Sequence, residues 1–416
     1  MFWFAPKKFN PASRPNLVAL SVYVFLLGIG FRFSTSIGAA DLLLPLFIAQ
    51  LFAFYGSHKY RWQSLLSFLL IAYTLTSATV LAFSNPSMAI YPLALAYRMT
   101  VFIVSLSYAA VATHCSALAD FRYIRHSCML FISFSFLMTC FNVISGSKAY
   151  YGYSQILFVS SPALAAFVLA SSSIYLFFSR SELTAFAEAR STLLFSLLSM
   201  LLALGTLSLS SFTSLIAGLV AFFGMKLFLS LKLQSRLQFN RIKKRNILLV
   251  LAFSLITFAL WSTGLIDSGH RLVNISQKLD YRLEKSSQIL ESCSDLICNL
   301  FGSGPGYHSM LLGSVPGEQS VLAYDQLYGR LIFEWGLVGS LLLVLALLYL
   351  LYKGPGLSFY VPSPSFAGFI VFGLAFGVGS EFIFVSPSGA LYASFVGLVS
   401  SRWARFSATP ETNYLQ

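Results

Sequence analysis

The chain has 416 residues, of which 57% are hydrophobic and only 10% are Asp, Glu, Lys or Arg. This composition excludes an ordinary soluble domain, in which about a quarter of the residues are charged. The net charge of +13 is typical of a membrane protein that keeps Lys and Arg on its cytoplasmic side, so we expect no nucleic acid among its partners.

Hydrophobic runs recur along the chain, and most have the roughly 20 residues that an α-helix needs to cross a bilayer. A strand in lipid would leave its backbone groups without partners, so the runs are predicted to be helices. They span residues 16–33, 39–56, 63–84, 90–112, 127–145, 155–178, 191–208, 212–231, 246–265, 331–352, 366–385 and 387–401. The sequence predicts an all-α, polytopic membrane helix bundle of about twelve transmembrane helices, forming a single transmembrane domain over residues 1–416.

The basic residues predict the orientation of these helices. With the N-terminus in the cytoplasm, every loop on that side carries Lys or Arg, including the run from Arg241 to Arg245, as the positive-inside rule requires. Both termini are then cytoplasmic. We predict a multi-pass protein of a bacterial inner membrane, with one large, partly helical loop over residues 266–330, between helices nine and ten, in the periplasm.

Of the five cysteines, Cys115 is predicted in a short basic loop, and the other four divide between an apolar segment and the large loop. Cys128 and Cys140 lie in an apolar segment and are predicted to pack as small hydrophobic residues. Cys293 and Cys298 lie in the large loop, where an oxidising periplasm would permit a disulfide, although their spacing alone leaves the pairing open. No Cys/His spacing matches a zinc site and no phosphate-binding Gly-Lys-Ser/Thr loop is present, so we expect neither metal nor cofactor.

Arg98 is unusual because it falls within an apolar segment, about two turns or on the order of 10 Å from its outer end. Buried arginines in membrane helices mostly face the bundle interior or a cavity. A contact to a ligand is one interpretation. An ion pair with Asp41 or Glu381, or extension of the side chain towards the headgroups, is the other.

Further arginines are predicted on the outer side. Arg330 precedes Glu334 by four residues, which indicates either an ion pair across one helical turn or a ligand site. Arg271 and Arg282 lie in the large loop, where each is a solvated charge or part of a site. Guanidinium groups suit a diphosphate because they donate paired hydrogen bonds to its oxygens.

Two side chains are candidate bases for such a site. Asp325 lies just before the tenth segment, and His308 follows a glycine-rich turn. Either could take a proton from a sugar hydroxyl if it lay within hydrogen-bonding distance. A lone loop histidine is, however, more often incidental.

Two glycine motifs flank the end of the large loop. Residues 300–307 read Leu-Phe-Gly-Ser-Gly-Pro-Gly-Tyr, and Asp325-Gln326 is followed, after nine residues, by Gly336 and Gly339. This pattern resembles the O-antigen ligase and polymerase superfamily, which has a Phe-Gly-x-Gly-x-Gly turn in its large periplasmic loop and a Gly-x-x-Gly leading into the next helix. Asp280-Tyr281-Arg282 also resembles the family's loop arginine.

The resemblance implies a membrane-embedded, inverting, metal-independent glycosyltransferase that uses a polyprenyl-diphosphate-linked sugar. Asp325 stands where the ligases have histidine, which favours an O-antigen polymerase over a ligase. The turn at residues 210–213 lacks the arginine that the family often has there, which leaves that diphosphate contact to Arg98.

The expected site follows from these motifs. Its catalytic candidates are Asp325 and His308; its diphosphate-binding candidates are Arg98, Arg271, Arg282 and Arg330; and its supporting residues are Glu334, Glu381, Gly304 and Gly336. The expected partners are an undecaprenyl-diphosphate-linked oligosaccharide, membrane lipids and a chain-length regulator. The alternatives are a ligase that moves glycan to lipid A core or protein and, less favoured, a secondary transporter or lipid flippase, which would place charges at the midplane.

Overall fold

A computed structural model describes residues 15–33, 37–55, 61–84, 86–115, 121–147, 156, 162–180, 186–206, 209–233, 296–304, 327–351, 364–377 and 387–407. Within these ranges the named elements are all helices, and isolated β-bridges occur between Arg32 and Gly38 and at Ile156. The predicted all-α class is therefore confirmed for this part of the protein.

The helices match the predicted apolar segments. In chain order they are α1 (Leu17–Ile29), η2 (Ala39–Leu43), α2 (Leu44–Tyr55), α3 (Arg61–Ser84), η3 (Pro86–Met88), α4 (Ile90–Cys115), α5 (Arg122–Ser145), α6 (Pro162–Arg180), α7 (Phe186–Gly205), α8 (Leu209–Leu233), α11 (Leu296–Phe301), α13 (Leu327–Leu351), α14 (Pro364–Gly377) and α15 (Ser388–Ser407). Each predicted segment that falls within the described ranges contains a helix. The segment 246–265 and most of the loop 266–330 lie outside them.

Among the described residues, five helices are long and apolar enough to cross a membrane, which indicates a membrane protein. These spans are Trp62–Ser84, Ile90–Thr113, Arg122–Ser145, Ala187–Gly205 and Leu327–Leu347. Other apolar helices, such as Leu17–Ile29 and Pro364–Gly377, are shorter over the described residues. The count of twelve crossings therefore stays a prediction.

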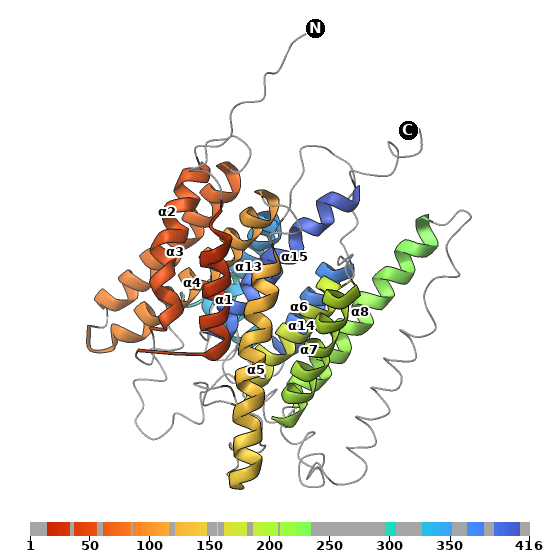
Figure 1. The fold of residues 1–416 in the computed structure, drawn as a ribbon. Helices are drawn as coiled ribbons and strands as arrows, with labels where there is room; N and C mark the ends of the chain where they lie inside the picture. Colours follow the sequence, from red (N-terminus) through yellow and green to blue (C-terminus); the bar gives the residue numbers. More distant parts are fainter. Residues whose placement is uncertain are drawn as a thin grey trace.

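Two of the closest helix pairs of the bundle, α8 with α14 and α4 with α15, join helices that are distant in the sequence (Figure 1). The most extensive packing joins α8 with α14, α4 with α15, α6 with α7, α3 with α4, and α1 with α5. Large aromatic side chains fill the interior between them, and Tyr23, Tyr108, Tyr175, Phe167 and Phe372 are completely buried. The core thus joins the N-terminal helices to the C-terminal pair α14 and α15.

Local sequence explains where several helices begin and end. The side chain of Asn16 accepts a hydrogen bond of 2.9 Å from the backbone N–H of Ala19, which caps the start of α1. Gly30 ends the same helix in the left-handed conformation, with φ of 70°. Proline opens both α6 and α14, at the helical position where its missing N–H costs least.

Several hydroxyl groups inside the bundle donate to backbone carbonyls, which suits an apolar setting. Ser67 and Thr74 each donate to the carbonyl four residues earlier, over 2.8 and 2.7 Å. Between α6 and α7, the hydroxyls of Ser173 and Ser196 each donate to the other residue's carbonyl oxygen, over 2.8 and 2.9 Å. These serines therefore join helices without leaving polar groups unpaired.

Small residues allow α8 and α14 to approach closely. Gly218 of α8 faces Gly368 of α14, and a Cβ added to Gly218 would lie 3.0 Å from the carbonyl oxygen of Gly368. Membrane helices commonly use such small residues because the apolar lipid gives no hydrophobic drive for association and close contact must supply it.

Several predicted boundaries are wrong, among them the starts of α5, α7 and α13. α5 begins at Arg122 and α7 at Phe186, so Arg125 and Arg190, which the sequence suggested were in connecting loops, lie in helical turns. The hydropathy of the sequence identifies the apolar part of each helix. The predicted boundaries differ because the helices continue beyond that part into polar residues. The tenth segment begins at Leu327 instead of residue 331, and its backbone is non-helical at Gly336.

Candidate functional site

The candidate site lies where the short helix α11 and the turn after it meet a break in α13. Within α13, Gly336 has φ of 65° and ψ of 177°, which interrupts the helix. An interruption of this kind removes helical partners from the carbonyls just before it. The backbone N–H groups of Ser303 and Gly304 donate to the carbonyl oxygens of Phe333 and Glu334, both over 2.9 Å.

Two side-chain hydroxyls also donate hydrogen bonds to backbone carbonyls near the break in α13. The hydroxyl of Ser303 donates a second hydrogen bond of 2.9 Å to the carbonyl oxygen of Phe333. From beyond the break, the hydroxyl of Ser340 reaches back to the carbonyl oxygen of Leu331, also over 2.9 Å. The broken turn thus keeps partners for its backbone, which membrane-spanning segments need.

Two glycines make the contact between the turn and the break possible. A Cβ on Gly302 would overlap the carbonyl of Glu334 and the nitrogen of Gly336, and a Cβ on Gly336 would overlap the carbonyl of Leu300 and the nitrogen of Gly302. Both have positive φ, which costs an ordinary L-residue about 1–2 kcal/mol. Gly302 also ends α11, donating to the carbonyl of Cys298 over 2.7 Å.

A buried ion pair lies in the first turns of α13. Nε of Arg330 is 3.2 Å from Oε1 of Glu334, and their side chains are 6% and 0% exposed. This confirms that the four-residue spacing forms an ion pair; ligand binding by Arg330 stays a prediction. Because the carbonyl of Glu334 also accepts from Gly304, one residue connects the ion pair to the turn.

Helix α3 forms the third side of this region. The rings of Tyr73 and Trp335 have centroids 5.3 Å apart, and Gly304 lies against Ser77 and Leu81. Trp335 is buried, and its indole N–H has no hydrogen-bond partner among the described residues. Sequence reasoning missed Trp335 and Ser303. The signal that could have identified these two residues is their position within the two glycine motifs.

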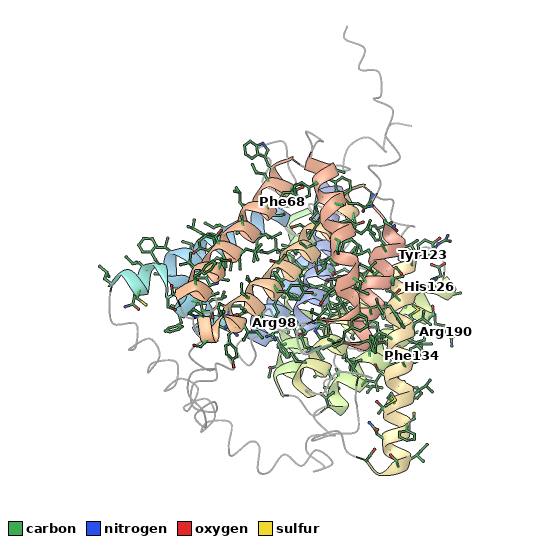
Figure 2. All side chains as sticks on the ribbon, turned by 90° about the vertical axis from the view of Figure 1, so that its left-hand side faces the viewer. Phe68, Arg98, Tyr123, His126, Phe134 and Arg190 are labelled. Atoms are coloured by element: carbon green, nitrogen blue, oxygen red, sulfur yellow. The ribbon has the colours of Figure 1, made fainter. Side chains whose placement is uncertain are left out.

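Arg98 lies on α4, half-buried within the bundle (Figure 2). The preceding residue, Tyr97, lies beside the buried carboxylate of Asp41. Asp41 accepts a hydrogen bond of 2.8 Å from the backbone N–H of Gly38. Partial burial lowers the pKa of Arg32, just beyond the C-terminal end of α1, and the charge of Asp41 opposes that shift. The alternative partner for Arg98, Glu381, lies outside the described residues.

The remaining predicted site residues, Arg271, Arg282, His308 and Asp325, also lie outside the described ranges. The structure therefore brings together Gly304, Arg330, Glu334 and Gly336, and the convergence of the other residues on them stays a prediction. Among the described residues no group of three or more His, Cys, Asp or Glu side chains gathers as a metal site would.

The cysteines follow the predicted division. Cys298 of α11 is disulfide-bonded, whereas Cys128 and Cys140 are free thiols in α5. Cys293, the partner that the sequence suggests for Cys298, lies outside the described residues, so that pairing stays a prediction.

Comparisons of the sequence with models of known protein families and with curated proteins find no match.

Proposed function

We propose that the chain is an O-antigen polymerase, or the polymerase of a related surface polysaccharide. In this proposal it transfers a growing glycan from undecaprenyl diphosphate to the non-reducing end of a lipid-linked repeat unit. The observation that supports it best is the contact of Gly302 and Gly304 with Glu334 and Gly336. These residues belong to the two motifs that carry the family resemblance, and they are about 30 residues apart in the chain.

The proposed topology has twelve crossings in a bacterial inner membrane, both termini in the cytoplasm and the loop 266–330 in the periplasm. In this topology α13 runs from the periplasm into the membrane, so the turn at residues 302–304 and the ion pair in the first turns of α13 would lie towards the periplasmic side. The diphosphate would bind on that side while the prenyl chain stays in the lipid.

The proposed chemistry is inverting transfer without a metal. Arg330, Arg282 and Arg98 stabilise the charge that develops on the leaving diphosphate, an electrostatic effect that is usually large in catalysis. The carboxylate of Glu334 holds the guanidinium of Arg330 in position through its contact with the Nε atom of Arg330. Asp325 takes the proton of the acceptor hydroxyl, which attacks the anomeric carbon from the face opposite the diphosphate.

The test uses the purified full-length protein in liposomes with a lipid-linked repeat unit as sole substrate. A polymerase lengthens the glycan. Arg282→Ala and Asp325→Asn abolish elongation, whereas Lys278→Ala, which removes a loop cation outside the motifs, preserves it. Membrane insertion of each variant is checked by its yield and unfolding temperature.

Two other outcomes would replace the proposal. Transfer that occurs only after lipid A core or a protein acceptor is added identifies a ligase. Movement of the lipid-linked repeat between leaflets without a new glycosidic bond identifies a flippase.

A further inference from the structure

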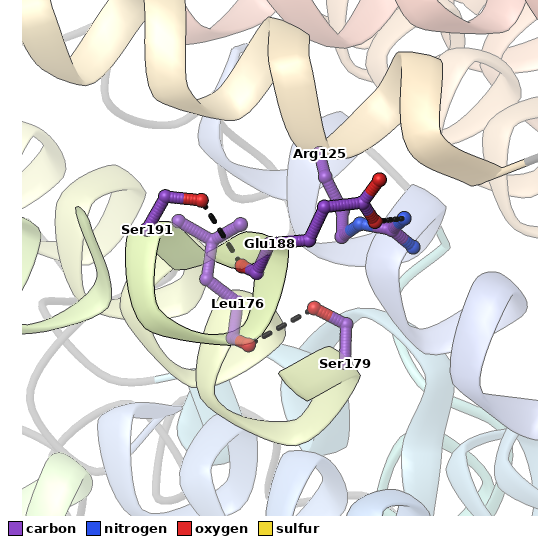
Figure 3. Close-up of polar contacts among 5 residues, drawn as sticks. All are labelled: Arg125, Leu176, Ser179, Glu188 and Ser191. Atoms are coloured by element: carbon purple, nitrogen blue, oxygen red, sulfur yellow. Dashed lines mark hydrogen bonds and ion pairs between the residues drawn. The ribbon is translucent and has the colours of Figure 1, made fainter. Parts of the chain in front are cut away.

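The first turns of α5 and α7 bring cations together, on helices that do not belong to the candidate site. Arg122, Arg125 and His126 belong to α5, and Arg190 to α7. The single carboxylate in these turns is Glu188, whose Oε2 is 3.7 Å from Nη2 of Arg125 (Figure 3). Because Glu188 is the one acidic residue in the first turns of α5 and α7, these turns carry a net positive charge.

The other cations of these turns are accessible at the surface. Arg122, His126 and Arg190 are exposed, and in Figure 2 the labelled Tyr123, His126 and Arg190 lie along the same edge of the bundle. The guanidinium of Arg122 lies 5.1 Å from the ring centre of Tyr123 and donates to its hydroxyl over 3.2 Å. Tyrosine is enriched where a membrane meets water, because its ring is apolar and its hydroxyl is polar.

An exposed apolar stripe continues from these cations along α5. Leu130, Phe134, Leu137 and Phe141 follow at intervals of four, three and four residues, and each is 45–63% exposed. This spacing places them on one face of the helix. The stripe rises about 16 Å along the helix, which is close to half of a hydrocarbon core of roughly 30 Å. It therefore has the length of an acyl chain in one leaflet.

We propose that the face formed by α5 and α7 binds an anionic phospholipid. Its phosphate lies at Arg122, His126 and Arg190, and one acyl chain follows the stripe from Leu130 to Phe141. A soluble anion would use the cations and leave the stripe uncovered. A second copy of the chain would bring a like-charged cluster against this one. This site is independent of the proposed glycan transfer.

The test measures which lipid the full-length protein retains. The protein in detergent is mixed with equal amounts of phosphatidylglycerol and phosphatidylcholine with the same acyl chains, and bound lipid is counted by native mass spectrometry. We expect phosphatidylglycerol to be retained preferentially. One cation near an anionic membrane surface contributes roughly a fivefold preference, so Arg190→Gln lowers retention about fivefold.

The matched control is Lys226→Gln, which removes an exposed cation from α8, outside this face. It leaves retention unchanged. Equal losses in the two variants, or equal retention of the two lipids, would overturn the proposal. So would displacement of the lipid by glycerol 3-phosphate, which identifies a soluble-anion site, or a lipid-free dimer, which identifies a second copy as the occupant.

Discussion

Gly302 and Gly336 lie against each other, and the backbone of each occupies the space that a side chain on the other would need. The contact joins the turn after α11 to the break in α13, and the hydrogen bonds of Ser303 and Gly304 surround it. Close packing and hydrogen bonding therefore depend on the same pair of residues.

Replacing either glycine should separate the turn from the helix. Gly336→Ala adds strain of about 1–3 kcal/mol, because a φ of 65° with a ψ of 177° is a conformation essentially confined to glycine, and its Cβ overlaps the backbone at Leu300 and Gly302. We expect the free energy of unfolding to fall by more than about 2 kcal/mol once weakened hydrogen bonds, each worth about 1 kcal/mol, are included.

Unfolding in detergent, followed by fluorescence, measures this loss. Gly339→Ala is the control on the same helix, because its Cβ would meet its nearest neighbour, a side-chain atom of Trp335, at an ordinary 3.4 Å. If Gly336→Ala and Gly339→Ala unfold alike, the close contact between the glycines does not contribute to stability.

The two ion pairs should differ in their effect on stability. Glu334→Gln removes the carboxylate from a pair that is almost wholly buried, and the cost of breaking such a pair is about 3–5 kcal/mol. Glu188→Gln should cost less than about 1 kcal/mol, because Glu188 is 58% exposed and water screens its charge. Urea unfolding of both variants gives the comparison, and equal losses would refute the assigned difference in burial.

A double substitution separates the structural role of Arg330 from its proposed diphosphate contact. Arg330→Met with Glu334→Leu replaces both charges by apolar groups, which is often neutral for stability. We expect unfolding within about 1.5 kcal/mol of the natural protein and no glycan elongation in the liposome assay. A stable variant that still elongates glycan would show that Arg330 has only a structural role.

The contact between α8 and α14 predicts a difference between two glycines of one helix. Gly218→Val should cost about 1–3 kcal/mol through overpacking, because its added carbons meet Phe372 and the backbone of Gly368. Gly224→Val has open space around its Cβ and should change stability by less than about 0.5 kcal/mol. Thermal unfolding of the two variants distinguishes them, and similar melting temperatures would argue against the close helix contact.

Sequence patterns predicted the parts of the fold that depend on local chemistry. Long apolar runs gave the helices, because a backbone in lipid must satisfy its own polar groups. The spacing of Arg330 and Glu334 indicated an ion pair as one of two interpretations, because residues four apart lie on one side of a helix, and the ion pair is present. Both inferences depend only on residues that are close together along a single helix.

The break at Gly336 could not be predicted in the same way. Glycine occurs in many continuous membrane helices, and this one departs from helical geometry where it meets Gly302, a distant residue. The burial of Trp335 against Tyr73 likewise depends on how α3 and α13 pack. The glycine motifs indicated that the two segments matter together, whereas only the three-dimensional arrangement explains how.

The interrupted helix also has a consequence for how the protein is made. Ser303 and Gly304 leave the ribosome before Phe333 and Glu334, whose carbonyl oxygens they later engage. The two donor residues are therefore already synthesised when α13 enters the bilayer. The carbonyl oxygens of Phe333 and Glu334 can then accept their hydrogen bonds without any later part of the chain. Correct insertion of α13 is thus expected to require the preceding segment in the same nascent polypeptide.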